Sequence, residues 1–217
     1  MARGHQSFSS MNLYDQCPAK YKFQYIDEIK TPSSLPLEGG SATHETLADF
    51  YNFKMKTGKD IPLSDFLAIF RYEFANHTAE LEEVSQTVIN NYQVKMEKCL
   101  TLYYADYAPK IMPKRVEFEL TAKIAGTKIL GKIDLLQTDN WIVDHKTTQK
   151  VPWGDVAAKS GQLSLYQWLC MKNNIETAGL RLDYIIAKKD PEILPLETER
   201  FLEDMVDIED WMIGIID

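Results

Sequence analysis

The chain has 217 residues, of which 45% are apolar and 26% are charged, and this composition predicts a globular protein with a full hydrophobic core. No stretch approaches the run of about 20 apolar residues that a membrane span requires, and the N-terminal residues lack the apolar centre of a secretion signal, so we expect a cytoplasmic location and no membrane partner. The net charge of −8 argues only in part against a nucleic-acid ligand, because residues 111–190 hold twelve basic and nine acidic residues whereas 191–217 holds one basic and nine acidic residues.

The first half of the chain has the periodicity of helices. Pro18 is expected to interrupt the first of them, for which Ser9 or Ser10 is the expected N-cap. Residues 31–40 contain two prolines and two adjacent glycines, so we expect a mobile loop there. The predicted helices cover residues 9–26, 41–56, 64–75 and 79–107.

The helix predicted over 41–56 carries a histidine on its apolar face. His44, Leu47, Ala48, Tyr51 and Met55 fall at helical spacing, so His44 is expected to point toward the protein interior. A histidine in such a place is most often a hydrogen-bonded core residue. It becomes a candidate ligand if this helix packs over the acidic strands that follow.

Beyond Pro109 the periodicity changes to that of strands. The predicted elements are strands over 115–124, 128–136 and 141–147, a helix over 155–173, strands over 180–188 and 193–200, and an acidic helix from residue 202 onward. This order predicts an α/β fold whose core runs helix, three-stranded antiparallel meander, helix, strand. We expect one domain, residues 1–217, with a mostly helical part (1–110) that carries His44, a sheet core (111–190) and an acidic C-terminal segment (191–217).

Two acidic residues and a lysine occur on the second and third predicted strands. Side chains two apart in a strand share a face, so Asp144 and Lys146 are expected on one side of the sheet and His145 on the other. Asp134 stands on the neighbouring strand. A charge among Ile, Leu and Val is costly unless it is paired or bound to a metal ion. A surface hairpin with a simple Asp–Lys pair is the alternative, but the pattern favours a functional site.

The oxygen atoms of this hairpin suit Mg²⁺ or Mn²⁺. Asp134 and Asp144 would supply two carboxylates, His145 its backbone carbonyl, and His44 a nitrogen from the covering helix. Lys146 would help to deprotonate a metal-bound water and would steady the developing charge of a phosphate. Metal-assisted hydrolysis of a phosphodiester needs these groups, so Asp134, Asp144 and Lys146 are the predicted catalytic residues.

Several motifs together resemble a known family, the PD-(D/E)XK nuclease superfamily, and most closely its RecB-like exonuclease branch. Gly131-Lys132-Ile133-Asp134 is similar to that family's glycine-x-x-aspartate strand, and Asp144-His145-Lys146 to its acid-x-lysine motif. Three further segments resemble the family's other motifs: Tyr14–Pro18, Gly40–His44 and Gln162–Tyr166. The resemblance spans about residues 9–188 and implies a restriction-endonuclease-like core.

The resemblance also implies roles for individual residues. It implies that His44 is a metal ligand, and that Gln162 and Tyr166, one helical turn apart, contact DNA phosphate or support Lys146. Glu117 and Glu119 share a face of the strand before Asp134. One of them would be an extra metal ligand or would form a hydrogen bond to a ligand. Simple exposed charges on a strand are an alternative of equal weight.

The cysteines separate this chain from some members of the resembled branch. Those members bind an iron–sulfur cluster through one N-terminal and three C-terminal cysteines. Cys17 fits the first position, but the chain has three cysteines and none after Cys170, so we expect no iron–sulfur cluster.

We therefore expect a Mg²⁺- or Mn²⁺-dependent DNA nuclease that hydrolyses phosphodiester bonds with metal-activated water. An exonuclease is preferred over an endonuclease, acting on DNA ends or single-stranded regions, in repair or recombination, in a bacterium or a phage-infected host cell. One alternative is a catalytically silent nuclease-fold module that grips DNA or a partner, for which a lost ligand or lysine would be the sign.

A second alternative is an interaction module in which the acidic terminus from Glu192 to Asp217 docks a basic protein partner or mimics DNA. A charge run of this kind is more typical of a solvated helix face. The run consists of Glu203, Asp204, Asp207, Glu209 and Asp210.

Overall fold

The computed structural model describes residues 4–81 and 83–216. Its helices are α1 (Phe8–Gln16), α2 (Pro18–Tyr21), a π-helical turn (Lys22–Ile26), α3 (Leu35–Thr57), α4 (Leu63–Thr78), α5 (Gln86–Asp106), a 3-10 turn (Ala108–Lys110), α6 (Gly161–Lys172) and α7 (Leu202–Ile216). Its strands are β1 (Pro113–Ile124), β2 (Thr127–Gln137), β3 (Trp141–Thr148), β4 (Gly179–Ile186) and β5 (Glu192–Thr198).

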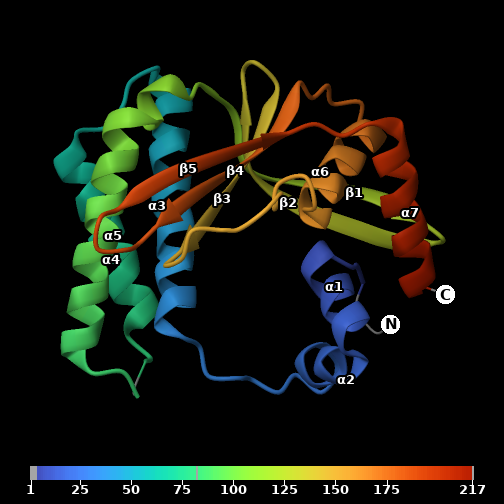
Figure 1. Ribbon diagram of the computed structural model, residues 1–217, viewed down its shortest axis with the longest axis horizontal. Helices are drawn as coiled ribbons and strands as arrows, with labels where there is room; N and C mark the ends of the chain where they lie inside the picture. The colour runs from blue at the N-terminus through green and yellow to red at the C-terminus, as the bar shows by residue number, and fades with distance from the viewer. Residues whose placement is uncertain (1–3, 82, 217) are drawn as a thin grey trace.

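The strands form a five-stranded sheet in the order β1-β2-β3-β4-β5 (Figure 1). Neighbouring strands are antiparallel except β3 and β4, which are parallel and are connected through α6. A parallel pair needs such a crossover, because the chain must return to the same end of the sheet before the second strand begins. The predicted α/β core of helix, antiparallel meander, helix and strand, with a helical N-terminal part, is confirmed.

Helices cover both faces of the sheet. Helices α3, α4 and α5 pack on one face, against Leu135 and Val143 among others, and lie together at the left of Figure 1. Helices α6 and α7 pack on the other face, against Leu136 and Ile142. Successive side chains of a strand point to opposite faces, so a strand covered on both faces needs apolar residues at consecutive positions. This explains why consecutive apolar residues follow Asp134 and precede Asp144.

The N-terminal residues attach α1 to the beginning of β2. Gln6 bridges to β2 through two backbone hydrogen bonds of 2.8 Å, donating its N–H to the Lys128 carbonyl and accepting from the Leu130 N–H. Ser7, not the predicted Ser9 or Ser10, is the N-cap of α1, and Ser10 completes a capping box with it. Helix α1 ends before Pro18, as predicted, because proline cannot continue the hydrogen-bond ladder of a helix.

The predicted loop over 31–40 is wrong for its second half, because α3 begins at Leu35 with Pro36 in its first turn. Gly39 lies inside this helix and packs against α5: a Cβ atom there would stand 2.4 Å from Cε1 of Tyr92. The glycine allows α3 and α5 to approach closely. Helix propensity alone predicts a loop at this position, because glycine is a poor helix former. Met55, predicted to be inward, is exposed near the C-terminal end of α3.

Two other helices begin later than predicted. Helix α5 starts at Gln86 rather than at residue 79; residue 82 lies outside the described residues. Helix α6 starts at Gly161 rather than at residue 155, because the Ser160 hydroxyl caps it by accepting from the Leu163 N–H. Within the described ranges, none of the helices is both long enough and apolar enough to cross a membrane.

Candidate active site

Strands β2 and β3 separate just before the predicted acidic residues. They pair at Leu135 with Val143 and at Leu136 with Ile142. At the next position the carboxylate of Asp134 replaces the backbone partner, because its Oδ2 accepts a 2.8 Å hydrogen bond from the His145 N–H. The side chain therefore satisfies a backbone donor of β3 and opens a gap between the two strands.

Asp144 and Lys146 lie on one face of β3, as the period of a strand predicts. The Lys146 Nζ stands 2.6 Å from Oδ2 of Asp144, and the Asp144 side chain is 1% exposed. The two form a close ion pair, and the ammonium group balances the charge of this buried carboxylate. A carboxylate has about four lone-pair sites, so the oxygens of Asp144 in the cavity wall can accept a cation as well as the lysine.

Helix α6 holds the ammonium group of Lys146 in place. Lys146 Nζ donates to Oε1 of Gln162 at 2.8 Å, and Nε2 of Gln162 donates to the Tyr166 hydroxyl at 2.7 Å. That hydroxyl in turn donates to the Lys132 carbonyl on β2 at 2.8 Å. The three side chains thus form a chain of hydrogen bonds that joins β3, α6 and β2 and restricts the lysine to one orientation.

Helix α3 brings His44 over the sheet, next to Asp134, which follows it by 90 residues in the sequence. Its Nδ1 lies 3.2 Å from Oδ2 of Asp134. One potential ligand atom from each of His44, Glu117 and Asp134 falls within 4.8 Å of the others, close enough to share one cation. Asp144 stands outside this compact group and faces Lys146 instead. Sequence reasoning expected His44, Asp134 and Asp144 as the side-chain ligands and gave Glu117 only as a possible extra ligand. In the structure Glu117, not Asp144, belongs to the compact group.

The two glutamates of β1 have different environments. Glu117 lines the cavity and lies 2.5 Å from Nζ of Lys132, whereas Glu119 is exposed and lies outside the cavity wall. Glu117 has a φ of 46°, a left-handed conformation that is unfavourable for a residue with a side chain. Such strain persists where the surrounding structure enforces it, often beside functional sites.

Lys132 was not singled out from the sequence. It stands two residues before Asp134, so the period of the strand places both on one face, and that signal was sufficient to find it. In the structure it pairs with Glu117. The hydrogen bond and charge of Glu117 raise the pKa of Lys132 and outweigh burial, which lowers it. It adds a second lysine to the rim of the site.

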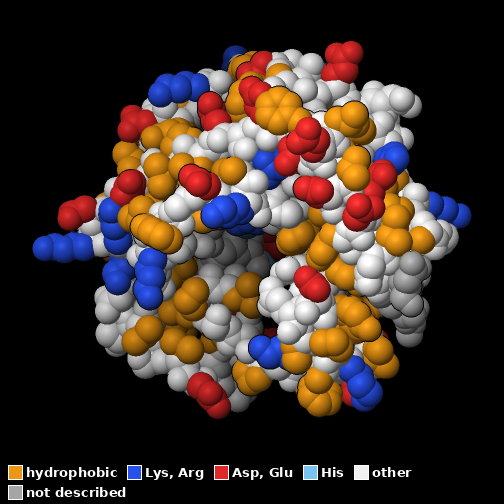
Figure 2. All heavy atoms as spheres, turned by 45° about the vertical axis from the view of Figure 1, so that its right-hand side comes forward, with side chains coloured by type: hydrophobic (Ala, Val, Ile, Leu, Met, Phe, Trp, Pro, Cys, Tyr) orange, Lys and Arg blue, Asp and Glu red, His pale blue; other side chains and the backbone are white. Residues whose placement is uncertain are grey.

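These residues line a cavity of about 800 Å³ that is bounded by α1 on one side and α3 on the other. Figure 2 shows the surface hollowed near the centre of the view, with apolar side chains beside the hollow. Among the predicted residues, the cavity wall includes His44, Glu117, Asp134, Asp144, His145, Lys146, Gln162 and Tyr166. The cavity is also lined by Ser7, the N-cap of α1, by Phe8 of α1 and by Leu37 of α3, and sequence reasoning did not find them.

The titration behaviour of the acidic groups fits a cation site. Burial raises the pKa of Asp144, and the charge of Asp134 adds to this effect, so together they outweigh Lys146. For His44, burial lowers the pKa, but the hydrogen bond and charge of Asp134 outweigh it and raise the pKa above its ordinary value. The Asp134 pKa is lowered, because hydrogen bonds from His145 and His44 outweigh burial. A cation bound there would favour the ionised carboxylates and the neutral imidazole of His44.

The side chain of His145 points to the opposite face of β3, as predicted, and it makes buried polar contacts there. Its Nε2 is 2.9 Å from the Tyr103 hydroxyl, which is 2.7 Å from the Tyr51 hydroxyl, and all three side chains are buried. Its Nδ1 faces Oδ2 of Asp134 at 3.7 Å. Two buried tyrosines from α3 and α5 thus fix the ring behind the strand that carries Asp144.

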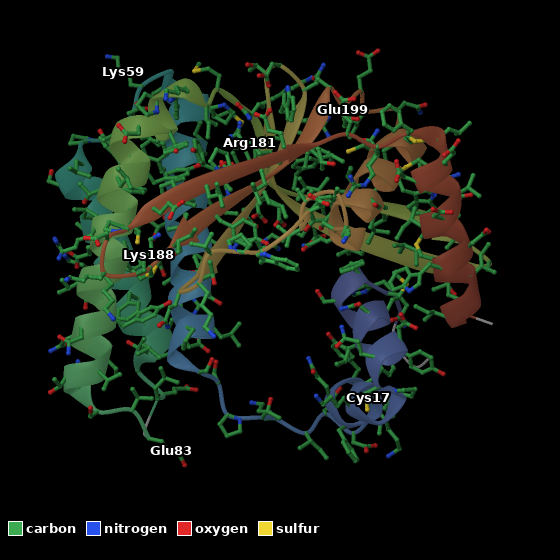
Figure 3. The ribbon with its side chains drawn as sticks, viewed as in Figure 1. Cys17, Lys59, Glu83, Arg181, Lys188 and Glu199 are labelled. Carbon is green, nitrogen blue, oxygen red and sulfur yellow. The ribbon has the colours of Figure 1, made fainter. Side chains whose placement is uncertain are left out.

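A buried ion pair stands beside this tyrosine and histidine network. Asp183 pairs with His145 across the β3–β4 ladder and accepts two hydrogen bonds from the guanidinium of Arg181, of 2.6 and 3.0 Å. Figure 3 labels Arg181 on β4 near the middle of the sheet. The pair satisfies a carboxylate that would otherwise be buried without a partner.

The family model of the PD-(D/E)XK nuclease superfamily matches residues 5–211. The chain belongs to this superfamily. The match runs through every predicted motif, and nucleases of this superfamily act on nucleic acids and generally use divalent metal ions. The cation-binding arrangement of His44, Glu117 and Asp134 agrees with that chemistry.

Two similar proteins place this nuclease among its relatives. It is 33% identical over 76 residues to the Gene 69 protein of Mycobacterium phage L5, a match that covers 35% of this chain and only about a quarter (26%) of the phage protein. A crystal structure of a candidate exonuclease from Eubacterium rectale has a TM-score of 0.65 at 14% identity, over 98% of this chain and 80% of that one. At this identity the second likeness concerns the fold.

The acidic C-terminal segment of the nuclease is partly occupied by internal contacts. Asp204 accepts from the Phe201 N–H at the start of α7, and Glu209 accepts from the Trp168 indole of α6 and pairs with Lys172. These contacts anchor α7 on α6. Docking of a basic partner by the remaining acidic residues stays a prediction.

The three cysteines stand on separate elements. Cys17 lies at the α1–α2 junction, labelled in Figure 3, while Cys99 is buried on α5 and Cys170 on α6. Burial raises the pKa of Cys99 to about 11 and that of Cys170 to about 12. Both are therefore thiols packed in the core at neutral pH.

Proposed function

We propose that this chain is a Mg²⁺- or Mn²⁺-dependent deoxyribonuclease of the RecB-like branch that degrades DNA from its ends. The observation that carries the proposal is the convergence of His44, Glu117, Asp134, Asp144 and Lys146 from four separate elements on one cavity wall. A metal site that had lost its function would not be expected to keep each of these groups, together with the hydrogen bonds that orient the lysine.

The proposed roles follow from the contacts. Asp134 is the central ligand, since it stands next to His44 and Glu117 on one side and shares a cavity wall with Asp144 on the other. The His145 carbonyl would complete the set. A divalent cation held there would stabilise phosphate charge as a Lewis acid and ease the deprotonation of water.

Lys146 would steady the scissile phosphate. Gln162 and Tyr166 fix its ammonium group before the substrate arrives, so little reorganisation remains at the moment of reaction. The proposed attack by water is in line with the bond that breaks and leaves 5′-phosphate and 3′-hydroxyl products. We propose that the source is a bacterium or a phage-infected cell, with repair or recombination as the setting.

The test compares linear and closed circular DNA with Mg²⁺ or Mn²⁺, using the wild type beside Lys146→Ala and Asp144→Ala. We expect the wild type to degrade linear DNA and spare the circle, and both variants to lose at least a hundredfold in rate. Equal activity of the three proteins would show contamination and refute the assignment. Nicking or linearisation of the circle would instead make the protein an endonuclease.

A catalytically silent module is the alternative function. It predicts DNA binding by the wild type with no turnover under any divalent metal ion. No lost ligand or lysine favours it, because His44, Asp134, Asp144 and Lys146 are each present and oriented in the structure.

A further inference from the structure

We propose that Trp153 forms a stacking site for an unpaired nucleobase at the rim of the active site. The inference rests on the proposed function in one respect, namely that the substrate is DNA, and it adds that the strand is bound single-stranded beside the loop 149–160.

Trp153 is displayed to solvent. It is 94% exposed, whereas Trp168 is fully buried and other exposed apolar side chains keep more contact with the protein. A tryptophan usually buries much of its large apolar surface, in a core or against a ligand. An indole that contacts almost nothing of its own chain is available for a partner with an aromatic face.

The loop that carries Trp153 begins and ends in the cavity wall. Thr147 lines the cavity five residues before Pro152, and Gln162 lines it after the loop. At about 3.6 Å per residue, the Cα of Trp153 lies within about 22 Å of that of Thr147. A strand whose phosphate contacts Lys146 can therefore reach the indole if it leaves the cavity along this loop.

Several contacts hold the base of this loop, so the indole is presented from an ordered support. The Thr148 hydroxyl accepts from the Lys150 N–H at 3.1 Å at the beginning of the loop. The guanidinium of Arg200 donates to the carbonyls of Ala157 and Ser160 at its end, at 2.9 and 3.1 Å. Binding on an ordered support costs less conformational entropy than binding that first orders a loop.

Charge and apolar surface near the loop favour single-stranded DNA over other partners. The loop contains Lys150 and Lys159 against Asp155, a net charge of +1 in a chain whose net charge is −8. Leu37, which is 62% exposed, and Phe8 add apolar surface at the cavity wall. Unpaired bases present faces that stack on such side chains, whereas a duplex presents mainly phosphates and groove edges.

The experiment measures binding of a fluorescein-labelled single-stranded oligonucleotide and of a closed hairpin duplex with no unpaired end. Each is titrated, with Mg²⁺ present, into the Asp144→Asn protein, in which the proposed function predicts that the substrate is not consumed. The same background then carries Trp153→Ala, Trp153→Phe or, as a matched exposed aromatic far along the chain on α4, Tyr72→Ala, whose parent side chain is 66% exposed.

We expect Trp153→Ala to weaken single-strand binding about tenfold, the loss of one base–aromatic stack, and to leave hairpin binding within twofold. Trp153→Phe should keep most of the affinity but lose the quenching of tryptophan emission that single-stranded DNA causes in the parent. Tyr72→Ala should bind as the parent does.

Unchanged single-strand binding in Trp153→Ala, an equal loss for both DNAs, or no binding by the parent would overturn the inference. The outcome is separable from the proposed function. A wild type that cleaves DNA while Trp153→Ala binds normally refutes the stacking site alone, whereas a wild type that binds through Trp153 and never cleaves refutes only the nuclease assignment.

Discussion

Oδ2 of Asp134 accepts a 2.8 Å hydrogen bond from the backbone N–H of His145, at the place where β2 and β3 cease to pair. The aspartate thus satisfies a strand donor and at the same time faces His44 at 3.2 Å. One carboxylate both shapes the gap between the strands and forms the centre of the candidate metal site. Changes at this site are therefore expected to affect folding as well as chemistry.

Glu117→Gln is expected to weaken Mn²⁺ binding at least tenfold, because it removes one charge from the group formed with His44 and Asp134. Glu119→Gln is the matched control, since it makes the same change two residues along β1 outside the cavity wall. Isothermal titration calorimetry with Mn²⁺ measures both. Equal affinities in the two variants would remove Glu117 from the site.

Lys146→Met is expected to lower the single-turnover cleavage rate by about a hundredfold or more while Mn²⁺ binding is kept or tightened. The ammonium group now balances Asp144 at 2.6 Å, so its loss leaves more negative charge for a cation. Lys123→Met, an exposed lysine at the far end of β1, serves as the control. A Lys146→Met protein that cleaves at the control rate would contradict the assigned role.

Tyr103→Phe is expected to reduce the free energy of unfolding by about 1–3 kcal/mol, because its hydroxyl joins two buried groups, His145 Nε2 and the Tyr51 hydroxyl. Tyr104→Phe removes one part-buried hydrogen bond to the Ile61 carbonyl and should cost less. Urea denaturation of the two variants gives the difference. Equal losses would mean that the buried network contributes no more to stability than the single part-buried hydrogen bond of Tyr104.

Gly131→Ala is expected to destabilise the fold by about 1–3 kcal/mol through overpacking. A Cβ at Gly131 would stand 2.5 Å from Cδ1 of Leu169 and 3.4 Å from the ring of Tyr166, both on α6. Since Tyr166 orients Gln162, cleavage should slow as well. Thermal unfolding and single-turnover rates measure the two effects; a variant with wild-type values in both would show that α6 moves away freely.

His77→Gln is expected to destabilise the protein more at pH 5.5 than at pH 9. His77 contacts Glu38 through Nδ1 at 2.9 Å and Glu45 through Nε2 at 3.1 Å, joining α4 to α3. Burial lowers the pKa of His77, but the two carboxylates outweigh it and raise the pKa above its ordinary value.

The direction of this pH dependence follows from the raised pKa of His77. The stabilisation from His77 is fully present below the unfolded-state pKa of about 6.5 and is lost as the pH rises through the raised folded-state pKa. The expected difference between wild type and variant is a few tenths to about 1 kcal/mol at pH 5.5 and smaller at pH 9. Urea denaturation at both pH values measures it, and a pH-independent difference would contradict the ion-pair account.

Local sequence pattern was sufficient for much of the core and for part of the site. The period of a strand placed Asp144 and Lys146 on one face and His145 on the other, and helical spacing placed Gln162 beside Tyr166. These relations depend on neighbouring residues within one element. The same periodicities predicted the order of strands and helices, and the motif order indicated the superfamily that the family comparison confirmed.

Relations between distant elements were decided by tertiary packing. The sequence allowed His44 to be either a core histidine or a ligand, and only the docking of α3 over the sheet set it 3.2 Å from Asp134. Strand periodicity predicts the same environment for Glu117 and Glu119. In the structure Glu117, which has a left-handed backbone conformation, lines the cavity, whereas Glu119 is exposed. Local pattern determines the side of an element on which a residue lies. Distances between elements depend instead on how residues from different elements pack, as the Tyr92 ring of α5 packs against Gly39 of α3.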